Sequence, residues 1–189
     1  MIRALVFLGV VLSSALSSAN IKHFDQFGNL DLQVLIQHVD SLFGDPLTGG
    51  RPYPVGPDHN LTPGEICQNP DTYRYPEHIA YCERDVDSSL KWKVIEKYND
   101  VLGYDIQAKD RSSFKIDHYI PLCMGGANAE SNLWPQHKSV YVITDPLEAE
   151  ACAKMSAGKL LQKKAIELIF EAKNDLSKAP AVLQQIRAL

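Results

Sequence analysis

The part of the sequence that decides the fold is residues 114–137, F-K-I-D-H-Y-I-P-L-C-M-G-G-A-N-A-E-S-N-L-W-P-Q-H. Its first half alternates apolar with other residues, the pattern of a half-buried strand, at Phe114, Ile116, Ile120 and Leu122. Residues 124–128 are typical of a turn, and Asn132 begins a second short strand that Pro135 ends. The stretch therefore predicts a hairpin, and we expect a helix to follow it.

Helices are predicted on both sides of this hairpin. Residues 87–102 carry one apolar stripe, with Asp87 or Ser88 as the N-cap and Gly103 as the end. Residues 145–148, D-P-L-E, form a capping box that starts a helix, with Asp at the N-cap, Pro at the first helical position and Glu at the third. Further helices are predicted at residues 30–43, 161–172 and 181–189. The expected fold class is α+β, a small hairpin-plus-helix core within a mainly helical domain.

The N-terminal residues have the pattern of an export signal. Arg3 precedes an apolar run over residues 4–12, and small residues up to Ala19 supply a cleavage site, which predicts a signal peptide at residues 1–19. Residues 44–64 are rich in Gly and Pro and exclude a long regular element. We therefore expect an N-terminal helical arm and loop-rich linker over residues 20–64, and the main domain over residues 65–189.

The cysteine content agrees with export. An even number of cysteines follows the predicted signal peptide, at Cys67, Cys82, Cys123 and Cys152, and this predicts two disulfides in a secreted or periplasmic protein. The pairing of Cys67 with Cys82 is the local choice among three possible connectivities. No C-x-x-C pair or closely spaced His pair is present, which disfavours a structural zinc site.

The composition limits the contacts that the protein can make. The chain has 189 residues, with 19 Lys and Arg against 23 Asp and Glu, and a formal net charge of −4. This excludes a uniformly basic coat for nucleic acid, but a local basic patch remains open. The residues expected to form such a patch are Lys91, Lys93, Lys97 and Lys109. No apolar run reaches the roughly 20 residues that a membrane-spanning helix needs, so we expect no membrane contact after signal removal.

The hairpin region contains three motifs, D-H-Y-I-P-L at residues 117–122, G-G at residues 125–126, and N-L-W-P-Q at residues 132–136. Together they resemble the signature of a branch of the HNH, or ββα-metal, endonucleases. The resemblance covers residues 115–155 well and residues 86–175 loosely. It implies a ββα-metal core and the metal-dependent hydrolysis of phosphodiester bonds in DNA, with RNA left open as a substrate.

The resemblance also implies a role for each motif residue. His118 matches the general base that takes a proton from water, and its ordinary pKa near 6.5 suits that task. Asp117 matches a ligand of one divalent metal ion, Mg²⁺ or Mn²⁺. Asn132 matches the amide that spans the loop and fixes the base. Neighbouring strand residues point to opposite faces, so Asp117 and His118 can reach one phosphate only if the strand twists or bulges.

The second protein ligand of the metal is where the chain departs from the family pattern. Many members place a His or Asn where this sequence has Tyr141, a poor ligand. We favour His137 as the second ligand. Asp145 is the first alternative and Glu148 the second, because the capping box already explains both. The cations near this region could bind the scissile phosphate, namely Arg84, Lys109, Arg111 and Lys115.

Two functions follow for this sequence. The first is an exported, metal-dependent endonuclease of low sequence specificity, since no base-reading motif is present. The second, motivated by the missing ligand, is a catalytically degenerate, disulfide-stapled module that binds nucleic acid or another partner. Other hydrolase classes have less support, because neither G-x-S-x-G nor H-E-x-x-H occurs.

Overall fold

The computed structural model of the protein describes residues 51–106 and 110–189. The chain divides into two units, Met1–Gly44 and Asp45–Leu189, and the described residues belong to the second unit. The predicted signal peptide, the predicted helix at residues 30–43 and Lys109 lie outside the described residues. None of the helices in the described ranges is long and apolar enough to cross a membrane.

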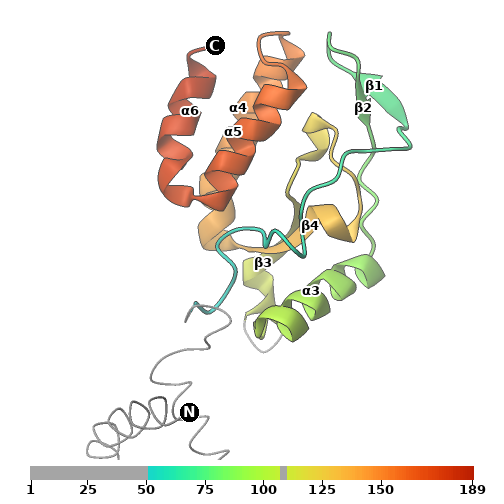
Figure 1. Cartoon of the computed structure of the whole chain (residues 1–189), viewed down its shortest axis with the longest axis vertical. Helices are drawn as coiled ribbons and strands as arrows, with labels where there is room; N and C mark the ends of the chain where they lie inside the picture. Colours follow the sequence, from blue (N-terminus) through green and yellow to red (C-terminus); the bar gives the residue numbers. More distant parts are fainter. Residues whose placement is uncertain (1–50, 107–109) are drawn as a thin grey trace, which may run out of the picture. The chain divides into compact units, whose positions relative to one another are not determined.

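The described chain has a mixed α+β fold, which confirms the expected fold class. Its helices are α3 (Ser88–Leu102), α4 (Lys138–Ser156), α5 (Gln162–Asn174) and α6 (Ala179–Arg187). Its strands form two antiparallel pairs, β1 (Thr72–Arg74) with β2 (Ile79–Tyr81) and β3 (Phe114–His118) with β4 (Leu133–His137). Helices α4, α5 and α6 pack side by side, α3 lies on the opposite side of the β3–β4 pair, and so the hairpin sits between them (Figure 1).

Two apolar cores meet at this hairpin. One core lies among the three C-terminal helices and includes Leu147, Met155, Leu168 and Ile186. The other joins α3 to the strands through residues such as Ile95, Tyr98, Ile116 and Trp134. The hairpin is therefore held from both sides, and a residue at its end can reach α4 and α5.

The hairpin matches the prediction in position and differs from it in length. Strand β3 ends at His118, earlier than the alternation of apolar residues suggests, because the chain bends into the loop there and Pro121 follows. Strand β4 continues to His137 with Pro135 inside it, opposite Ile116. Strand β4 has a neighbour on one side only, and proline is tolerated in such edge strands because its missing N–H can face away from the ladder.

The loop between the strands requires glycine. Gly125 has a φ of 83°, in the left-handed region that glycine adopts without strain. A Cβ atom on Gly126 would lie 1.8 Å from the carbonyl oxygen of Ile120, so no other residue fits there. The G-G motif is thus explained by the left-handed backbone at Gly125 and by the close approach of the Ile120 carbonyl at Gly126.

The predicted capping box at residues 145–148 is wrong. Helix α4 begins at Lys138, and His137 is its N-cap, with the side chain accepting a hydrogen bond from Ser139 N. Pro146 lies inside the helix, where it removes one backbone hydrogen bond. The earlier start is favoured by burial, because Val140 and Thr144 continue the buried stripe of α4 toward its N-terminus.

The helices predicted at residues 87–102, 161–172 and 181–189 are confirmed. Helix α3 begins after Asp87, whose carboxylate accepts from Leu90 N at 2.7 Å, and it ends at Gly103 in the left-handed conformation. Helix α5 corresponds to the stripe predicted at residues 161–172. Helix α6 corresponds to the last predicted helix and begins slightly earlier, with Pro180 in its first turn, where proline costs no hydrogen bond.

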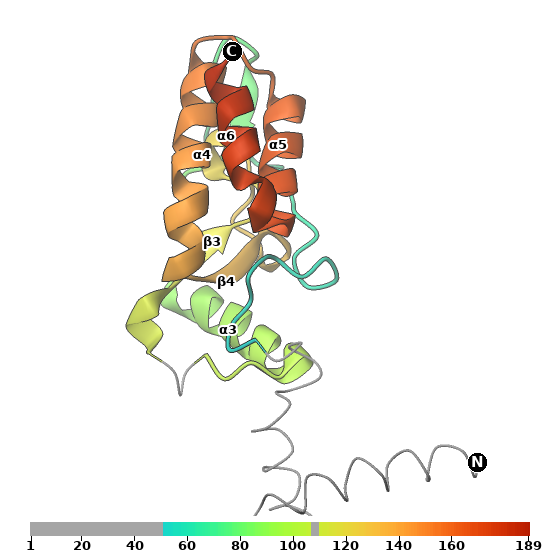
Figure 2. The same ribbon diagram turned by 90° about the vertical axis from the view of Figure 1, so that its left-hand side faces the viewer.

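The segment over residues 51–64, expected to be part of a linker, packs against the domain (Figure 2). Leu61 and Thr62 are buried, and the Thr62 hydroxyl donates to the Leu133 carbonyl at 3.0 Å. Gly64 N donates to the Ser131 carbonyl at 2.8 Å. These contacts make the segment part of the compact unit that begins at Asp45, ahead of the boundary expected at residue 65.

Both predicted disulfides are present, and each joins cysteines that are neighbours in the order of the sequence. Cys67 bonds to Cys82, with a Cα–Cα distance of 5.8 Å, and Cys123 bonds to Cys152, with a Cα–Cα distance of 6.0 Å. The first joins the chain before β1 to the end of β2, and the second joins the β3–β4 loop to α4. Two disulfides are compatible with an extracellular protein.

Candidate metal and catalytic site

Asp117 and His118 end strand β3 and contact different parts of the protein. The pairing of β3 with β4 is one to one along the whole strand, with no bulge. The Asp117 carboxylate lies against Lys173 of α5, while the His118 ring lies against Arg84 and Asn128. The strand therefore keeps its normal alternation here. The bulge that would aim both side chains at one point is absent from β3.

Three carboxylates meet on the Asp117 side of β3. Oxygen atoms of Asp117, Asp145 and Glu148 all lie within 4.8 Å of one another, and we call these residues the acidic cluster. Asp145 and Glu148 are three residues apart on α4 and so share one face of the helix. Carboxylate oxygens are the donors that Mg²⁺ and Mn²⁺ prefer, so the cluster fits the metal that the motif implies.

Two lysines balance most of the charge of the acidic cluster. Lys173 is 1% exposed, and its Nζ lies 2.7 Å from Glu148 Oε1 and 3.5 Å from Asp117 Oδ2. The same Nζ donates to the His118 carbonyl at 2.6 Å. Lys115 Nζ lies 2.7 Å from Asp145 and 3.5 Å from Asp117. One formal negative charge is left in excess, which favours a further cation.

Burial and these ion pairs shift the ionisation of the cluster in opposite directions. Burial alone would raise the pKa of Asp117, but Lys173, Lys115 and His118 lower it overall. Burial raises the pKa of Glu148 in spite of Lys173. Burial would lower the pKa of Lys173, but Glu148 and Asp117 raise it above its ordinary value. Lys173 is therefore a charged ammonium group at neutral pH.

His118 lies on the other side of β3, where its ring contacts an amide and a guanidinium group. Its ring is 3% exposed, with Nε2 at 3.0 Å from Asn128 Oδ1 and Nδ1 at 3.3 Å from a terminal nitrogen of Arg84. Burial lowers the pKa of His118 to about 4; Asn128 opposes the shift and Arg84 adds to it. The ring is uncharged at neutral pH and so has a lone pair with which to accept a proton.

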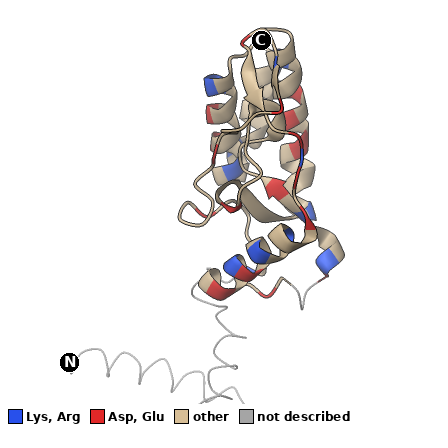
Figure 3. Ribbon diagram, turned by 90° about the vertical axis from the view of Figure 1, so that its right-hand side faces the viewer, with Lys and Arg blue, Asp and Glu red and all other residues tan. Residues whose placement is uncertain are grey.

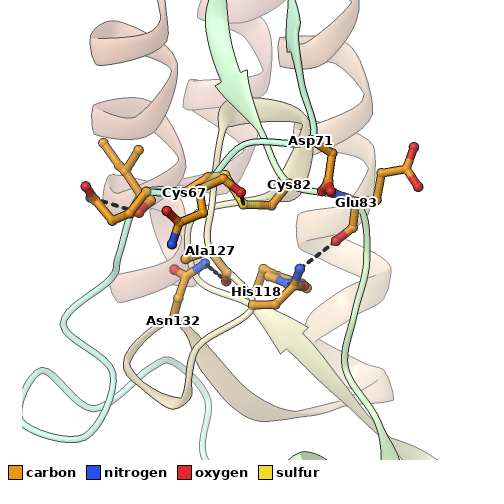
Figure 4. The surroundings of a disulfide bond; sticks show 11 residues. Cys67, Asp71, Cys82, Glu83, His118, Ala127 and Asn132 are labelled. Atoms are coloured by element: carbon orange, nitrogen blue, oxygen red, sulfur yellow. Dashed lines mark hydrogen bonds between the residues drawn. A yellow bond between two sulfur atoms is a disulfide. The ribbon is translucent and has the colours of Figure 1, made fainter.

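Asn132 holds the loop that joins the two strands. It is fully buried; its Nδ2 donates to the carbonyls of Ile120 and Ala127, both at 3.0 Å, and its Oδ1 accepts from Ile120 N at 2.8 Å (Figure 4). These bonds span the loop. The His118 ring is held by a different amide, that of Asn128.

His137 lies away from the acidic cluster. It pairs with Phe114 at the far end of the hairpin, while Asp117 pairs with Trp134. The His137 ring stacks on Tyr53, with ring centroids 3.8 Å apart, and its Nδ1 caps α4. The structure therefore does not place His137, the expected second ligand, near Asp117. It places the two alternatives, Asp145 and Glu148, there. Sequence reasoning ranked Asp145 and Glu148 lower because it assigned them to a helix start that does not exist.

The cations near the motif have different contacts. Arg84 contacts His118, Lys115 belongs to the ion pairs around Asp117, and Arg111 donates to the Phe114 carbonyl at 2.7 Å. The lysines expected to form a patch on α3 share that helix with two acidic residues, Glu96 and Asp100 (Figure 3). Lys97 also donates to the Leu61 carbonyl. Arg84 is thus the candidate phosphate ligand that lies next to the expected base.

Sequence reasoning missed two residues that shape this site, Lys173 and Asn128. Lys173 interrupts the buried stripe of α5 one turn after Ile169, and a lysine at such a position signals a buried charge with a partner. Asn128 ends the M-G-G-A-N turn, where its side chain carried no separate signal. No protein-family model, curated protein or solved structure matches the chain.

Proposed function

We propose that the protein is an exported, metal-dependent endonuclease that hydrolyses phosphodiester bonds of DNA, with RNA as a further substrate to be tested. The observation that supports this most is at the end of β3, where a neutral buried histidine follows directly on a carboxylate that meets two carboxylates of α4. Hydrolysis of a phosphodiester needs a proton acceptor for water and positive charge at the phosphoryl oxygens. The two sides of β3 offer one of these each, and because β3 has no bulge, the proposal requires the end of the strand to twist so that both groups reach one phosphate.

The acidic cluster would hold the metal. Asp117, Asp145 and Glu148 offer oxygen atoms close enough together for one Mg²⁺ or Mn²⁺ ion. A divalent ion bound there supplies a Lewis acid that stabilises negative charge on the phosphate. Lys115 and Lys173 keep the three carboxylates near one another by offsetting their mutual repulsion.

His118 and Arg84 would act on the substrate from the other side. The uncharged ring of His118 takes the proton of the attacking water. The Arg84 guanidinium, beside that ring, binds an oxygen of the scissile phosphate through charge-assisted hydrogen bonds. Contacts of this kind bind the sugar–phosphate backbone and not the bases, which agrees with low sequence specificity.

A plasmid-nicking assay tests this proposal. The protein without its predicted signal peptide is incubated with supercoiled DNA in Mg²⁺, in Mn²⁺ and in chelator. We expect nicking only with metal, and a loss of about 100-fold or more in the His118→Ala variant, the usual contribution of a general base. The matched control is His59→Ala, which removes an exposed histidine and leaves activity unchanged. Nicking that survives chelator, or equal rates in both variants, would contradict the proposal.

A catalytically degenerate module is the second candidate, and two observations favour it. The His118 ring is almost fully buried, and the Lys173 ammonium already lies among the carboxylates. A protein of this kind would be inert in every metal but would still bind DNA, with an affinity that falls as salt rises. Fluorescence anisotropy with labelled DNA at several salt concentrations measures this. If the protein does not nick DNA but binds it with this salt dependence, the second candidate is correct and the enzyme proposal is wrong.

A further inference from the structure

The Asn128 side chain lies between the Glu83 carbonyl and the His118 ring. Its Nδ2 donates to the Glu83 carbonyl oxygen at 2.6 Å, and this fixes which end of the amide is which. Its Oδ1 then faces His118 Nε2 at 3.0 Å. An amide oxygen only accepts hydrogen bonds, so Nε2 must carry the hydrogen.

The opposite edge of the His118 ring leads to the same assignment. Nδ1 lies 3.3 Å from a terminal nitrogen of Arg84, and a guanidinium group only donates. The other terminal nitrogen of Arg84 donates to the Ile116 carbonyl of β3 at 3.0 Å, which fixes the guanidinium. In an uncharged ring with Nε2–H, the nitrogen without hydrogen is Nδ1, and that atom faces Arg84.

Residues 82–84 carry two of these contacts, and we call them the anchored segment. Glu83 and Arg84 are exposed, so the segment is held by specific bonds more than by burial. Cys82 is bonded to Cys67, and Cys67 N donates in turn to the Gly125 carbonyl of the β3–β4 loop at 2.8 Å. Glu83 N donates to Asp71 at 2.8 Å (Figure 4). The disulfide thus ties the segment to the loop that follows His118.

We propose that Asn128 and Arg84 are positioning residues that hold His118 in one orientation and one tautomer, in which Nε2 carries the hydrogen and Nδ1 keeps the lone pair. The Cys67–Cys82 disulfide fixes the anchored segment, which carries Arg84 and the Glu83 carbonyl that holds Asn128. The catalytic meaning of this inference rests on the proposed function, whereas the tautomer can be measured independently. The expected general base is therefore set by an amide and a disulfide outside the motif of residues 117–118.

Nitrogen-15 spectra of the histidine rings test the tautomer at one fixed pH of 7.5. We expect the wild-type His118 signals to show a single Nε2–H tautomer, assigned by their loss in His118→Gln. In Asn128→Leu, which has a similar size and no acceptor, the two tautomers should mix. Asn128→Asp keeps an acceptor toward Nε2 and should restore the single pattern. A wild-type Nδ1–H tautomer, or an unchanged pattern in Asn128→Leu, would overturn the proposal.

Paired cysteine variants test the anchor. In Cys67→Ser/Cys82→Ser the tautomers should mix as in Asn128→Leu, while Cys123→Ser/Cys152→Ser should keep the single pattern. If the first variant does not fold, Arg84→Met, which leaves both disulfides intact and removes the donor toward Nδ1, should still mix the tautomers. An unchanged His118 spectrum in every variant that folds would remove the anchoring role.

The nicking assay separates this inference from the proposed function. In an active enzyme, Asn128→Leu should lower the turnover rate by about 10- to 100-fold, as for other hydrogen-bond partners that orient a functional histidine, and Asn128→Asp should recover part of it. A change in the tautomer without any change in rate would contradict the positioning role. An inactive wild-type protein with the expected spectrum would leave the tautomer assignment standing and remove the proposed enzyme.

Discussion

Buried polar groups are stabilised in different ways on the two sides of strand β3. On the Asp117 side, charges of both signs are held together, with Lys173 as the most buried member. On the His118 side, a ring is kept uncharged by burial and held by single hydrogen bonds to Asn128 and Arg84. Because strand neighbours alternate, this dipeptide places a carboxylate among several charged groups and a base beside one charged group, Arg84. The first side should be sensitive to the loss of a charge, and the second to pH.

Removal of the Lys173 charge should have the largest effect. Lys173→Met leaves Glu148 and Asp117 buried without their main partner, which typically costs about 3–5 kcal/mol of the free energy of unfolding. Urea unfolding at pH 7 measures this loss. The double variant Lys173→Met/Glu148→Leu also removes the buried charge of Glu148, which is left unpaired in the single variant, and should recover part of the stability. A single variant as stable as wild type would show that the charges do not hold this side together.

A lower pH should have the second-largest effect on stability, through the protonation of His118. The unfolded histidine has a pKa of about 6.5 and the folded one has a pKa of about 4, so the unfolded state binds more protons between these values. Stability should therefore fall as the pH is lowered from 6.5 to 4, by up to about 3 kcal/mol from this group. Urea unfolding at pH 7.5 and 4.5 measures the change, which should shrink in His118→Gln and persist in His59→Gln. Equal pH dependence in both variants would assign the effect to other groups.

The Cys123–Cys152 disulfide belongs mainly to the α4 side of the comparison. It closes a loop over a sequence separation of 29, and its loss should cost about 2–4 kcal/mol. Thermal melting of Cys123→Ser/Cys152→Ser against wild type measures this. Because the bond joins the loop to the helix that carries Asp145 and Glu148, metal-dependent nicking should fall with it. An unchanged melting temperature would mean that this bond contributes little to the fold.

Binding of a divalent ion should give the smallest effect and sharpen the choice of ligands. An ion at ten times its Kd stabilises the folded protein by about 1.4 kcal/mol. We expect Mn²⁺ to raise the melting temperature of wild type and of His137→Ala, and to have no effect on Asp145→Ala. The reverse result would make His137 the ligand and exclude the acidic cluster.

The sequence predicts most elements of the fold because their signals are local. Alternation of apolar residues located β3, and Asp87 and Gly103 marked the two ends of α3. The start of α4 could not be read in this way. The local pattern at Asp145 satisfied a capping box, but the burial of Val140 against the second core extended the helix toward its N-terminus.

The candidate site was predictable only in part, for a related reason. The D-H pair and Asn132 are close in sequence and were found by their motif. Lys173 is 56 residues from Asp117 and reaches it from helix α5, a contact that no spacing rule predicts. His137 was favoured as a ligand because it is near the motif in sequence, but the strand directs its ring toward Tyr53.

The packing of residues 51–64 sets a practical limit on how the protein can be shortened. Tyr53 covers the His137 ring, and Thr62 bonds to the Leu133 carbonyl. A recombinant fragment that starts at residue 65 would leave both partners facing water and would uncover the buried carbonyl of β4. Fragments for crystallisation should therefore begin upstream of Tyr53, and those that begin after Gly64 are expected to be poorly expressed.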